Sequence, residues 1–251
     1  MNDTIALLQR HRSIRKFKET AIPEEQLKQI VLSGQAASTS SNIQAYSVIV
    51  VKDPVKKQKL AELSGNQQQI VESPVFLIWC ADLNKIQTAV RLHEDVELKQ
   101  NVETLLLGTI DATLAAQNAV VAAESLGYGI VYIGGIRNNP KQVSELLELP
   151  PLVYPVFGLS IGVPDQEPDI RPRQPIAAVY HEETYQSDRI VSSIREYDEV
   201  TRHYYATRKG GVGKGGDQET TWSREMLRRF NSNRTRGHLR GFLEGQGFEL
   251  Q

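Results

Sequence analysis

The sequence contains only one cysteine, Cys80, among its 251 residues. A single cysteine excludes an internal disulfide bond and any zinc or iron–sulfur site built from several cysteines. Because Cys80 lies inside the apolar run Val75–Ala81, we expect it to be a small buried core residue. No two of the five histidines are spaced to ligate one metal ion from one helix face, so we predict no metal site.

Long apolar runs and an excess of one charge are also absent. The longest strictly apolar run, Val75–Ala81, has seven residues, whereas a membrane-spanning helix needs roughly 20. Twenty-nine basic and 30 acidic residues give a net charge of −1, without the broad positive field that non-specific nucleic-acid binding needs. The first ten residues lack the basic region of a secretion signal. We therefore expect a cytoplasmic protein that binds neither membranes nor nucleic acids.

The composition is that of an ordinary globular protein, with 40% hydrophobic and 24% charged residues. Short β-branched or apolar segments predict four strands, at Tyr46–Val51, Val75–Cys80, Gly129–Gly135 and Tyr154–Val163. Apolar spacing and capping residues predict helices from Asp3 or Thr4 to His11, and at 23–37, 101–126, 140–149, 190–208 and 220–246. Strands separated by helices predict α/β or α+β layers.

Three other segments have distinctive compositions. Residues 101–126 contain no proline and many alanines, so we expect a central, closely packed helix. Three prolines in 165–175 predict an extended, rigid segment. Five glycines within 209–216 predict that the Gly210–Gly216 loop is mobile.

Several motifs resemble catalytic or binding signatures without their structural context. Gly158-Leu159-Ser160-Ile161-Gly162 has the spacing of a serine-hydrolase nucleophile elbow, but Val163-Pro164 follows where a helix should begin. We interpret Ser160 as part of a core strand, although the hydrolase alternative predicts that replacing it abolishes ester cleavage. Gly127-Tyr128-Gly129 precedes a strand and lacks the third glycine of a dinucleotide fingerprint. Residues Gly210–Gly216 contain the Gly-Lys pair of a phosphate-binding loop, but Gly215 stands where that loop needs serine or threonine.

Six arginines lie close together near the C-terminus, at 224, 228, 229, 234, 236 and 240. This pattern is typical of a solvated helical face, and binding of an anion, nucleotide or partner is the alternative. Three further polar patches lie next to the ends of predicted elements, at 11–15, 38–42 and 171–173. If they converge, their arginines and serine hydroxyls supply the charge-assisted hydrogen bonds that a phosphate or mononucleotide needs.

The chain resembles the nitroreductase superfamily of FMN enzymes, and within it the oxygen-insensitive NADPH nitroreductases and NADPH:flavin oxidoreductases. The resemblance covers nearly the whole chain. It is carried by residues 11–17 (HRSIRKF), 38–44 (STSSNIQ), 64–67 (SGNQ), 122–127 (AAESLG), 131–138 (VYIGGIRN) and 169–173 (DIRPR).

The resemblance implies an α+β fold in which helices flank a central, mainly antiparallel sheet. It implies one FMN-dependent nitroreductase domain over residues 1–251, with 165–251 as an extended segment and helical C-terminal excursion. Members of the family are homodimers with FMN at the interface. Ser38, Thr39, Ser40 and Ser41 are therefore expected to contact FMN from the partner subunit.

The resemblance also assigns roles to individual residues. The FMN phosphate is expected to bind His11, Arg12, Arg171 and Arg173. The isoalloxazine ring is expected to be bordered by Ser13, Arg15, Gln67, Tyr132, Ile133, Gly134 and Gly135. The positive charge of Arg15 would support charge developing near flavin N1 and O2. Arg208 matches a position that contacts the NADPH 2′-phosphate, although the loop after it differs from relatives and leaves the choice between NADPH and NADH open.

The implied reaction is a ping-pong, two-electron reduction with no catalytic acid or base assigned to the protein. NADPH is the expected donor, and the acceptors are small molecules: nitroaromatics, quinones, azo compounds or free flavin. Two alternatives remain open. One is a dedicated NAD(P)H:FMN reductase that supplies reduced flavin, and the other is a flavin-binding redox module with little turnover.

Overall fold

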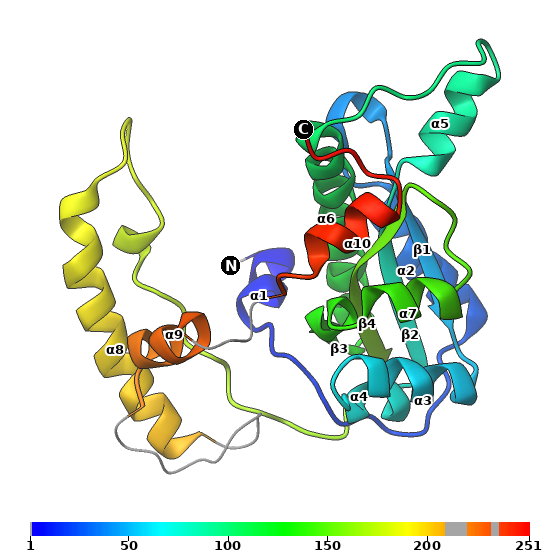
Figure 1. Cartoon of the computed structure of the whole chain (residues 1–251). Helices are drawn as coiled ribbons and strands as arrows, with labels where there is room; N and C mark the ends of the chain where they lie inside the picture. The colour runs from blue at the N-terminus through cyan, green and yellow to red at the C-terminus, as the bar shows by residue number, and fades with distance from the viewer. Residues whose placement is uncertain (1, 209–219, 232–235) are drawn as a thin grey trace. The chain divides into compact units, whose positions relative to one another are not determined.

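The computed structural model describes residues 2–208, 220–231 and 236–251 (Figure 1). Among these residues the chain forms two compact units. Unit 1 comprises the described parts of Met1–Gln9, Ser13–Gln166 and Arg236–Gln251, and unit 2 comprises those of Arg10–Arg12 and Glu167–Thr235. The predicted mobile loop Gly210–Gly216 lies outside the described residues.

Unit 1 is built on a four-stranded antiparallel sheet with the order β1-β2-β4-β3. The four predicted strands are confirmed, as β1 (Tyr46–Val51), β2 (Val75–Asp82), β3 (Gly129–Ile133) and β4 (Val153–Gly162). Strand β3 ends at Ile133, before the predicted Gly135, because Gly134–Arg137 turn into a 3-10 helix. Strands β1 and β3 are therefore the two edges of the sheet.

Helices cover both faces of this sheet (Figure 1). Alternate residues of β2 supply two cores. Leu77 and Trp79 pack in the core that contains α2 (Glu24–Gln35) and α6 (Val102–Ser125). Phe76, Ile78 and Cys80 pack in the core formed with α3 (Pro54–Leu63), α4 (Gln68–Glu72) and α7 (Pro140–Leu146). This arrangement confirms the α+β class. Cys80 is buried in the core, as expected, and loss of solvation raises the pKa of its thiol.

Strand β4 confirms that Ser160 belongs to the core. Ser160 is fully buried and pairs with Phe76 on β2 and Val131 on β3. Its strand neighbour Gly158 packs under the Phe76 ring, where a Cβ atom would lie 2.1 Å from Phe76 Cζ. A serine enclosed in this way cannot serve as the exposed nucleophile of a strand–turn–helix elbow.

Helix α6 is closely packed on one face only. Ala112, Ala115 and Ala119 are fully buried against the sheet and α2, as predicted. The opposite face differs from the prediction, because it exposes an apolar stripe: Val102, Leu106, Ile110 and Leu114, each 42–50% exposed. Among the described residues, α6 is the one helix long and apolar enough to cross a membrane, a test that core helices also pass.

The remaining helices of unit 1 include three that the sequence analysis missed: α3, α4 and α5 (Asn84–Arg91). Helix α1 spans Asp3–Gln9 and ends before the predicted His11. Its cap comes from Asn2, whose Oδ1 accepts the backbone N–H of Thr4 at 2.9 Å, and not from Asp3 or Thr4. Helix α10 (Leu239–Gly245) is followed by Phe248, which enters the core.

Unit 2 contains the segment after Gln166 and two longer helices, α8 (Ile190–Thr207) and α9 (Trp222–Phe230). Helix α8 agrees with the prediction for 190–208, whereas the region predicted as helical at 220–246 contains two separate helices, α9 here and α10 in unit 1. The part of the proline-rich segment in this unit, Glu167–Pro175, has no helix or strand, in agreement with the extended conformation expected from its prolines.

Candidate functional site

The segment Ser13–Arg15 runs beside the edge strand β3. Ser13 forms a parallel bridge with Ile130, and the Ile14 N–H donates to the Ile130 carbonyl oxygen at 2.8 Å. The Arg15 guanidinium folds back and donates to the Ser13 carbonyl oxygen at 3.4 Å. Ser13 is therefore fixed beside β3, and Arg15 is tied back to Ser13.

The turn after β3 contains Gly134 and Gly135. A Cβ atom on Gly135 would lie 2.3 Å from the carbonyl oxygen of Ser64, so only glycine allows this close approach of the two backbones. Ser64 begins the connection to α4 that carries Gln67, whose N–H donates to the Ala61 carbonyl oxygen at 3.1 Å. The structure thus brings the Gln67 segment and the Gly134–Gly135 turn together.

Tyr132 lies on β3 between these groups. Its ring contacts Phe157 edge to face at 5.1 Å between centroids, and its hydroxyl donates to Gln117 Oε1 at 3.3 Å. Loss of solvation raises the pKa of the Tyr132 hydroxyl, so it remains protonated at neutral pH. The side chain is therefore engaged with β4 and α6.

The Ser38–Ser41 loop joins α2 to β1, at the other edge of the sheet. Ser41, Asn42 and Gln44 have left-handed backbone conformations, with φ angles of 47°, 58° and 54°. Such conformations are costly for residues other than glycine and persist only where the surroundings enforce them.

Asp111 supplies this restraint, and the sequence analysis missed it. Its carboxylate is fully buried on α6 and accepts the N–H of Ser40 at 3.2 Å and of Ala45 at 3.0 Å. The two bonds bracket the strained residues. The available signal was one acid in the middle of an otherwise apolar helix, because a buried carboxylate needs specific partners.

The cationic residues expected at the phosphate lie in unit 2. Arg12 donates to the carbonyl oxygen of Pro168 at 3.2 Å and forms an ion pair with Glu167 at 3.3 Å. Arg171 and Arg173 are exposed on the same extended segment, and Arg173 donates to the Arg171 carbonyl oxygen at 2.9 Å. His11 is partly buried next to Arg12.

Arg208 ends helix α8. Its N–H donates to the Tyr204 carbonyl oxygen at 2.9 Å, and its guanidinium lies 5.2 Å from the centre of the Tyr205 ring. This cation–π contact orients the guanidinium without neutralising its charge.

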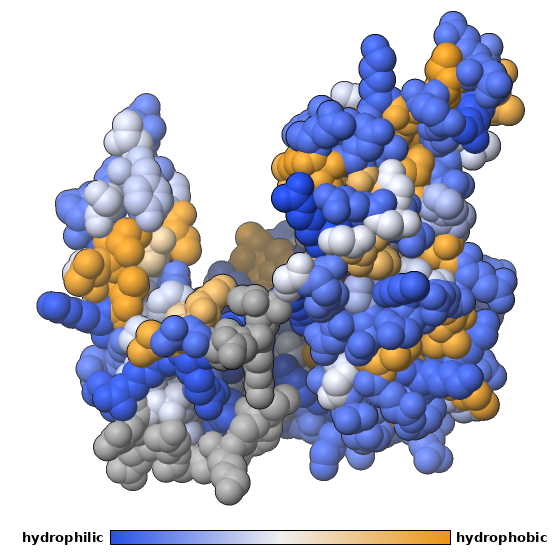
Figure 2. Space-filling model, viewed as in Figure 1, coloured by the Kyte–Doolittle hydropathy of each residue, from blue (hydrophilic) through white to orange (hydrophobic). Residues whose placement is uncertain are grey.

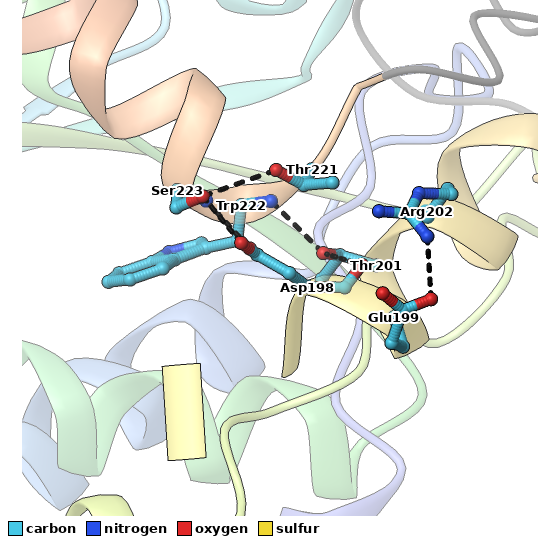
Figure 3. A network of polar contacts seen from close by, with 7 residues as sticks. All are labelled: Asp198, Glu199, Thr201, Arg202, Thr221, Trp222 and Ser223. Atoms are coloured by element: carbon cyan, nitrogen blue, oxygen red, sulfur yellow. Dashed lines mark hydrogen bonds and ion pairs between the residues drawn. The ribbon is translucent and has the colours of Figure 1, made fainter. Parts of the chain in front are cut away.

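Helices α8 and α9 are joined by a polar network (Figure 3). The Asp198 carboxylate accepts the N–H of Ser223 at 2.9 Å and its hydroxyl at 2.5 Å. Thr201 Oγ1 accepts the N–H of Trp222 at 3.0 Å, and the Trp222 ring lies 5.8 Å from that of Tyr197. Side chains from α8 therefore hold the first turn of α9, in addition to its own cap Thr221, whose Oγ1 accepts the N–H of Arg224 at 3.4 Å.

Three of the six arginines clustered between 224 and 240 make contacts of different kinds. Arg228 and Arg240 form exposed ion pairs with Glu225 and Glu244 on their own helices, and Arg236 donates to Asn138 Oδ1 at 3.0 Å. Arg234 lies outside the described residues. The two exposed pairs are what a solvated helical face would show.

A separate groove of about 570 Å³ lies between α2 and β1. Its lining is mainly apolar, and two of its three charged residues, Glu24 and Lys52, form an ion pair at 2.5 Å that lowers the pKa of the Glu24 carboxyl group. None of the residues predicted to bind FMN lines this groove.

Comparison with known proteins gives matches along the whole chain. Residues 8–163 match the nitroreductase family, and residues 171–251 match the nitroreductase family C-terminal domain. The FMN reductase (NADPH) of Bacillus subtilis is 42% identical over 252 residues, covering 99% of both chains. The oxygen-insensitive NADPH nitroreductase of Salmonella typhimurium is 38% identical over 250 residues, also covering 99% of both.

A solved structure gives the same result for the fold. The hypothetical oxidoreductase YcnD from Bacillus subtilis superimposes with a TM-score of 0.94 at 39% identity, covering 100% of both chains. Both the family matches and the relatives extend over nearly all of the sequence. The chain therefore belongs to the nitroreductase family.

Proposed function

We propose that this protein is an FMN-dependent oxidoreductase that uses NADPH, with NADH as the alternative donor, to reduce small-molecule acceptors by two electrons. The expected acceptors are nitroaromatics, quinones, azo compounds and free flavin. The observation that carries this proposal is the pair of contacts at the two ends of β3: Ser13 bridges Ile130 near its start, and Gly135, just after its end, lies against Ser64 in the connection that carries Gln67. The names of the B. subtilis and S. typhimurium relatives support the same activity.

The chemistry of these residues fits FMN. The guanidinium groups of Arg12, Arg171 and Arg173, with His11, are suited to the phosphate, since guanidinium forms charge-assisted and bidentate hydrogen bonds to phosphate oxygens. The glycine backbone of the β3 turn allows a flat ring to approach closely. Ser13, Tyr132 and Ile133 would border the ring, and Ser38, Thr39, Ser40 and Ser41 would approach it from the partner subunit.

When bound, FMN would accept a hydride from NADPH and deliver two electrons to the acceptor. The residues of this chain supply orientation and charge. Arg15 would hold its positive charge near N1 and O2, which favours the negative charge that develops there. Arg208, oriented by Tyr205, would bind the 2′-phosphate that distinguishes NADPH from NADH.

The proposal includes a homodimer. Among the described residues the apolar stripe of α6 stays 42–50% exposed, and exposed apolar patches mark association surfaces. In addition, the Ser38–Ser41 loop leads into β1 while the other ring residues gather at β3, on opposite edges of one sheet. A second copy is the simplest source of both groups at one flavin.

Unit 2 also exposes apolar side chains. Val191 and Val200 on α8 are 59% and 46% exposed, and hydrophobic groups appear over α8 in Figure 2. We propose that residues 1–251 act as one functional domain, with 165–251 as its extended segment and helical excursion. We also propose a cytoplasmic location. The single cysteine, Cys80, is a buried free thiol, and thiols stay reduced in the cytoplasm.

The visible spectrum of the purified protein under nitrogen tests the function directly. We expect flavin absorption bands that bleach on adding one equivalent of NADPH and return when a nitroaromatic or quinone is added. A protein that neither contains nor binds FMN and does not oxidise NADPH would contradict the proposal.

A dedicated flavin reductase is the second candidate, and the name of the B. subtilis FMN reductase favours it. The two activities separate kinetically. If free FMN is the physiological acceptor, kcat/KM for added FMN should exceed that for nitrofurazone or a quinone, and FMN reduction should saturate. A redox module would instead bind FMN with negligible turnover of NADPH.

A further inference from the structure

Tyr197 of α8 contacts the backbone between the two arginines of the extended segment. Its side chain is buried, with 6% of the residue exposed, and its hydroxyl donates to the carbonyl oxygen of Pro172 at 2.8 Å. Pro172 stands between Arg171 and Arg173 and has no N–H of its own. The bond from Tyr197 therefore fixes the Pro172–Arg173 peptide, and the proline ring restricts the backbone of Arg171 before it.

The surroundings of Tyr197 hold its ring in place. The Trp222 ring packs against it, and Trp222 is itself fixed by the bond from its N–H to Thr201 and by the Asp198–Ser223 pair (Figure 3). Burial raises the pKa of the Tyr197 hydroxyl, against the opposing charges of Arg171 and Arg173. The hydroxyl therefore stays protonated and remains a donor to Pro172.

We propose that Tyr197 is a positioning residue that makes the protein select a phosphorylated flavin over its dephosphorylated form, riboflavin. It acts through Arg171 and Arg173, so this inference rests on the proposed function, in which those arginines bind the FMN phosphate. A peptide that is held in one conformation presents both guanidinium groups together and loses less conformational entropy on binding the ligand. Riboflavin has no phosphate, so its affinity should not depend on the conformation of this peptide.

The test compares Tyr197→Phe with the unchanged full-length chain after its flavin has been removed. Binding of FMN and of riboflavin is measured separately, by titration of flavin fluorescence. We expect the Kd for FMN to rise about five- to tenfold, the effect of one lost neutral hydrogen bond. The Kd for riboflavin should not change. The phenylalanine ring retains the contact with Trp222, and Pro172 is not fully buried, so its carbonyl can bind water instead.

Tyr180→Phe is the matched control. It removes a tyrosine hydroxyl from the same unit, one that donates at 3.3 Å to the exposed Glu182, and it should change neither Kd. If Tyr197→Phe raises both Kd values equally, Tyr197 only stabilises the fold and the inference fails. It also fails if neither value changes.

A double variant, Arg171→Ala with Arg173→Ala, separates this inference from the proposed function. Loss of FMN affinity in the double variant, with no effect of Tyr197→Phe, would overturn only the role of Tyr197. Unchanged FMN affinity in the double variant would instead overturn the phosphate site itself.

Discussion

Asp111 and Lys57 are charged side chains that the fold buries almost completely, at 0% and 7% exposure. Each makes its hydrogen bonds to backbone groups. Asp111 accepts two N–H groups of the loop before β1. Lys57 donates to the carbonyl oxygens of Val71 at 3.1 Å and Ser73 at 2.6 Å, near the end of α4. In both cases one side chain fixes a connection between elements.

We expect Asp111→Ala to lower the free energy of unfolding by roughly 2–4 kcal/mol, because two partly or fully buried N–H groups lose a charged acceptor. The strained loop should also relax, which predicts weaker FMN binding. Urea denaturation measures the first effect and flavin titration the second. As a control, Asp53→Ala removes an exposed cap of α3 and should cost only about 1 kcal/mol. Equal losses in the two variants would contradict the special role of Asp111.

Lys57 predicts a pH dependence of stability. Burial lowers its pKa in the folded protein, while the unfolded chain has the ordinary lysine value of about 10.4. Between these two pKa values the unfolded state binds more protons, so the contribution of Lys57 to the unfolding free energy rises with pH. Below the folded pKa its unfavourable contribution is complete and constant.

Urea denaturation of the unchanged protein and of Lys57→Met across the alkaline range measures this contribution. The difference in unfolding free energy, unchanged protein minus variant, should increase as the pH approaches about 10.4. A difference that stays constant or decreases would show that the pKa of Lys57 is not lowered by folding.

At the scale of elements, the sequence predicted all four strands because each is a short apolar segment bounded by turn residues. It missed α3 and α5, each of which begins soon after a strand ends. In both, an aspartate accepts the N–H three residues later: Asp53 from Lys56 at 2.6 Å and Asp82 from Lys85 at 3.1 Å. An aspartate at or just beyond the end of a strand can thus also begin a helix, and local composition does not separate a strand end from a helix start.

The candidate site was predictable to a smaller extent. Its residues were named from the resemblance, and the structure shows why some lie together: Ser13 bridges β3, and Gly135 contacts Ser64. Asp111 and Tyr197 were not predicted as parts of it. Their partners Ser40 and Pro172 are 71 and 25 residues away along the chain, so only the tertiary fold brings them into contact.

The junction of α8 and α9 gives a prediction at this scale. Asp198→Ala removes the acceptor of both Ser223 groups, so the first turn of α9 should open more often. Hydrogen exchange should become faster in residues 222–230 while the middle of α8 stays protected. Glu199→Ala is the control, because it removes only the exposed ion pair with Arg202 (Figure 3). Equal exchange in the two variants would contradict this account of the junction.

At the scale of the whole molecule, the exposed stripe of α6 predicts the oligomeric state. Ile110→Glu places a charge in the middle of that stripe and should convert a dimer, of twice 28.1 kDa, into a monomer of 28.1 kDa in sedimentation experiments. Burying an unpaired carboxylate in an apolar interface is strongly unfavourable. Val55→Glu is the control on α3, where Val55 is 62% exposed on the other side of the sheet. A dimer that persists in Ile110→Glu would exclude this helix as the interface.

Helix α6 carries Ile110 on its exposed face and, one residue later, Asp111 on its buried face. One rigid element thus joins the surface proposed for association to the loop proposed to contact flavin across it. Thermodynamic reciprocity then applies: if association strengthens FMN binding by some factor, bound FMN strengthens association by the same factor. Dilution of the enzyme should release flavin, and saturation with flavin should hold the subunits together, so the fraction of active protein depends on its own concentration as well as that of FMN.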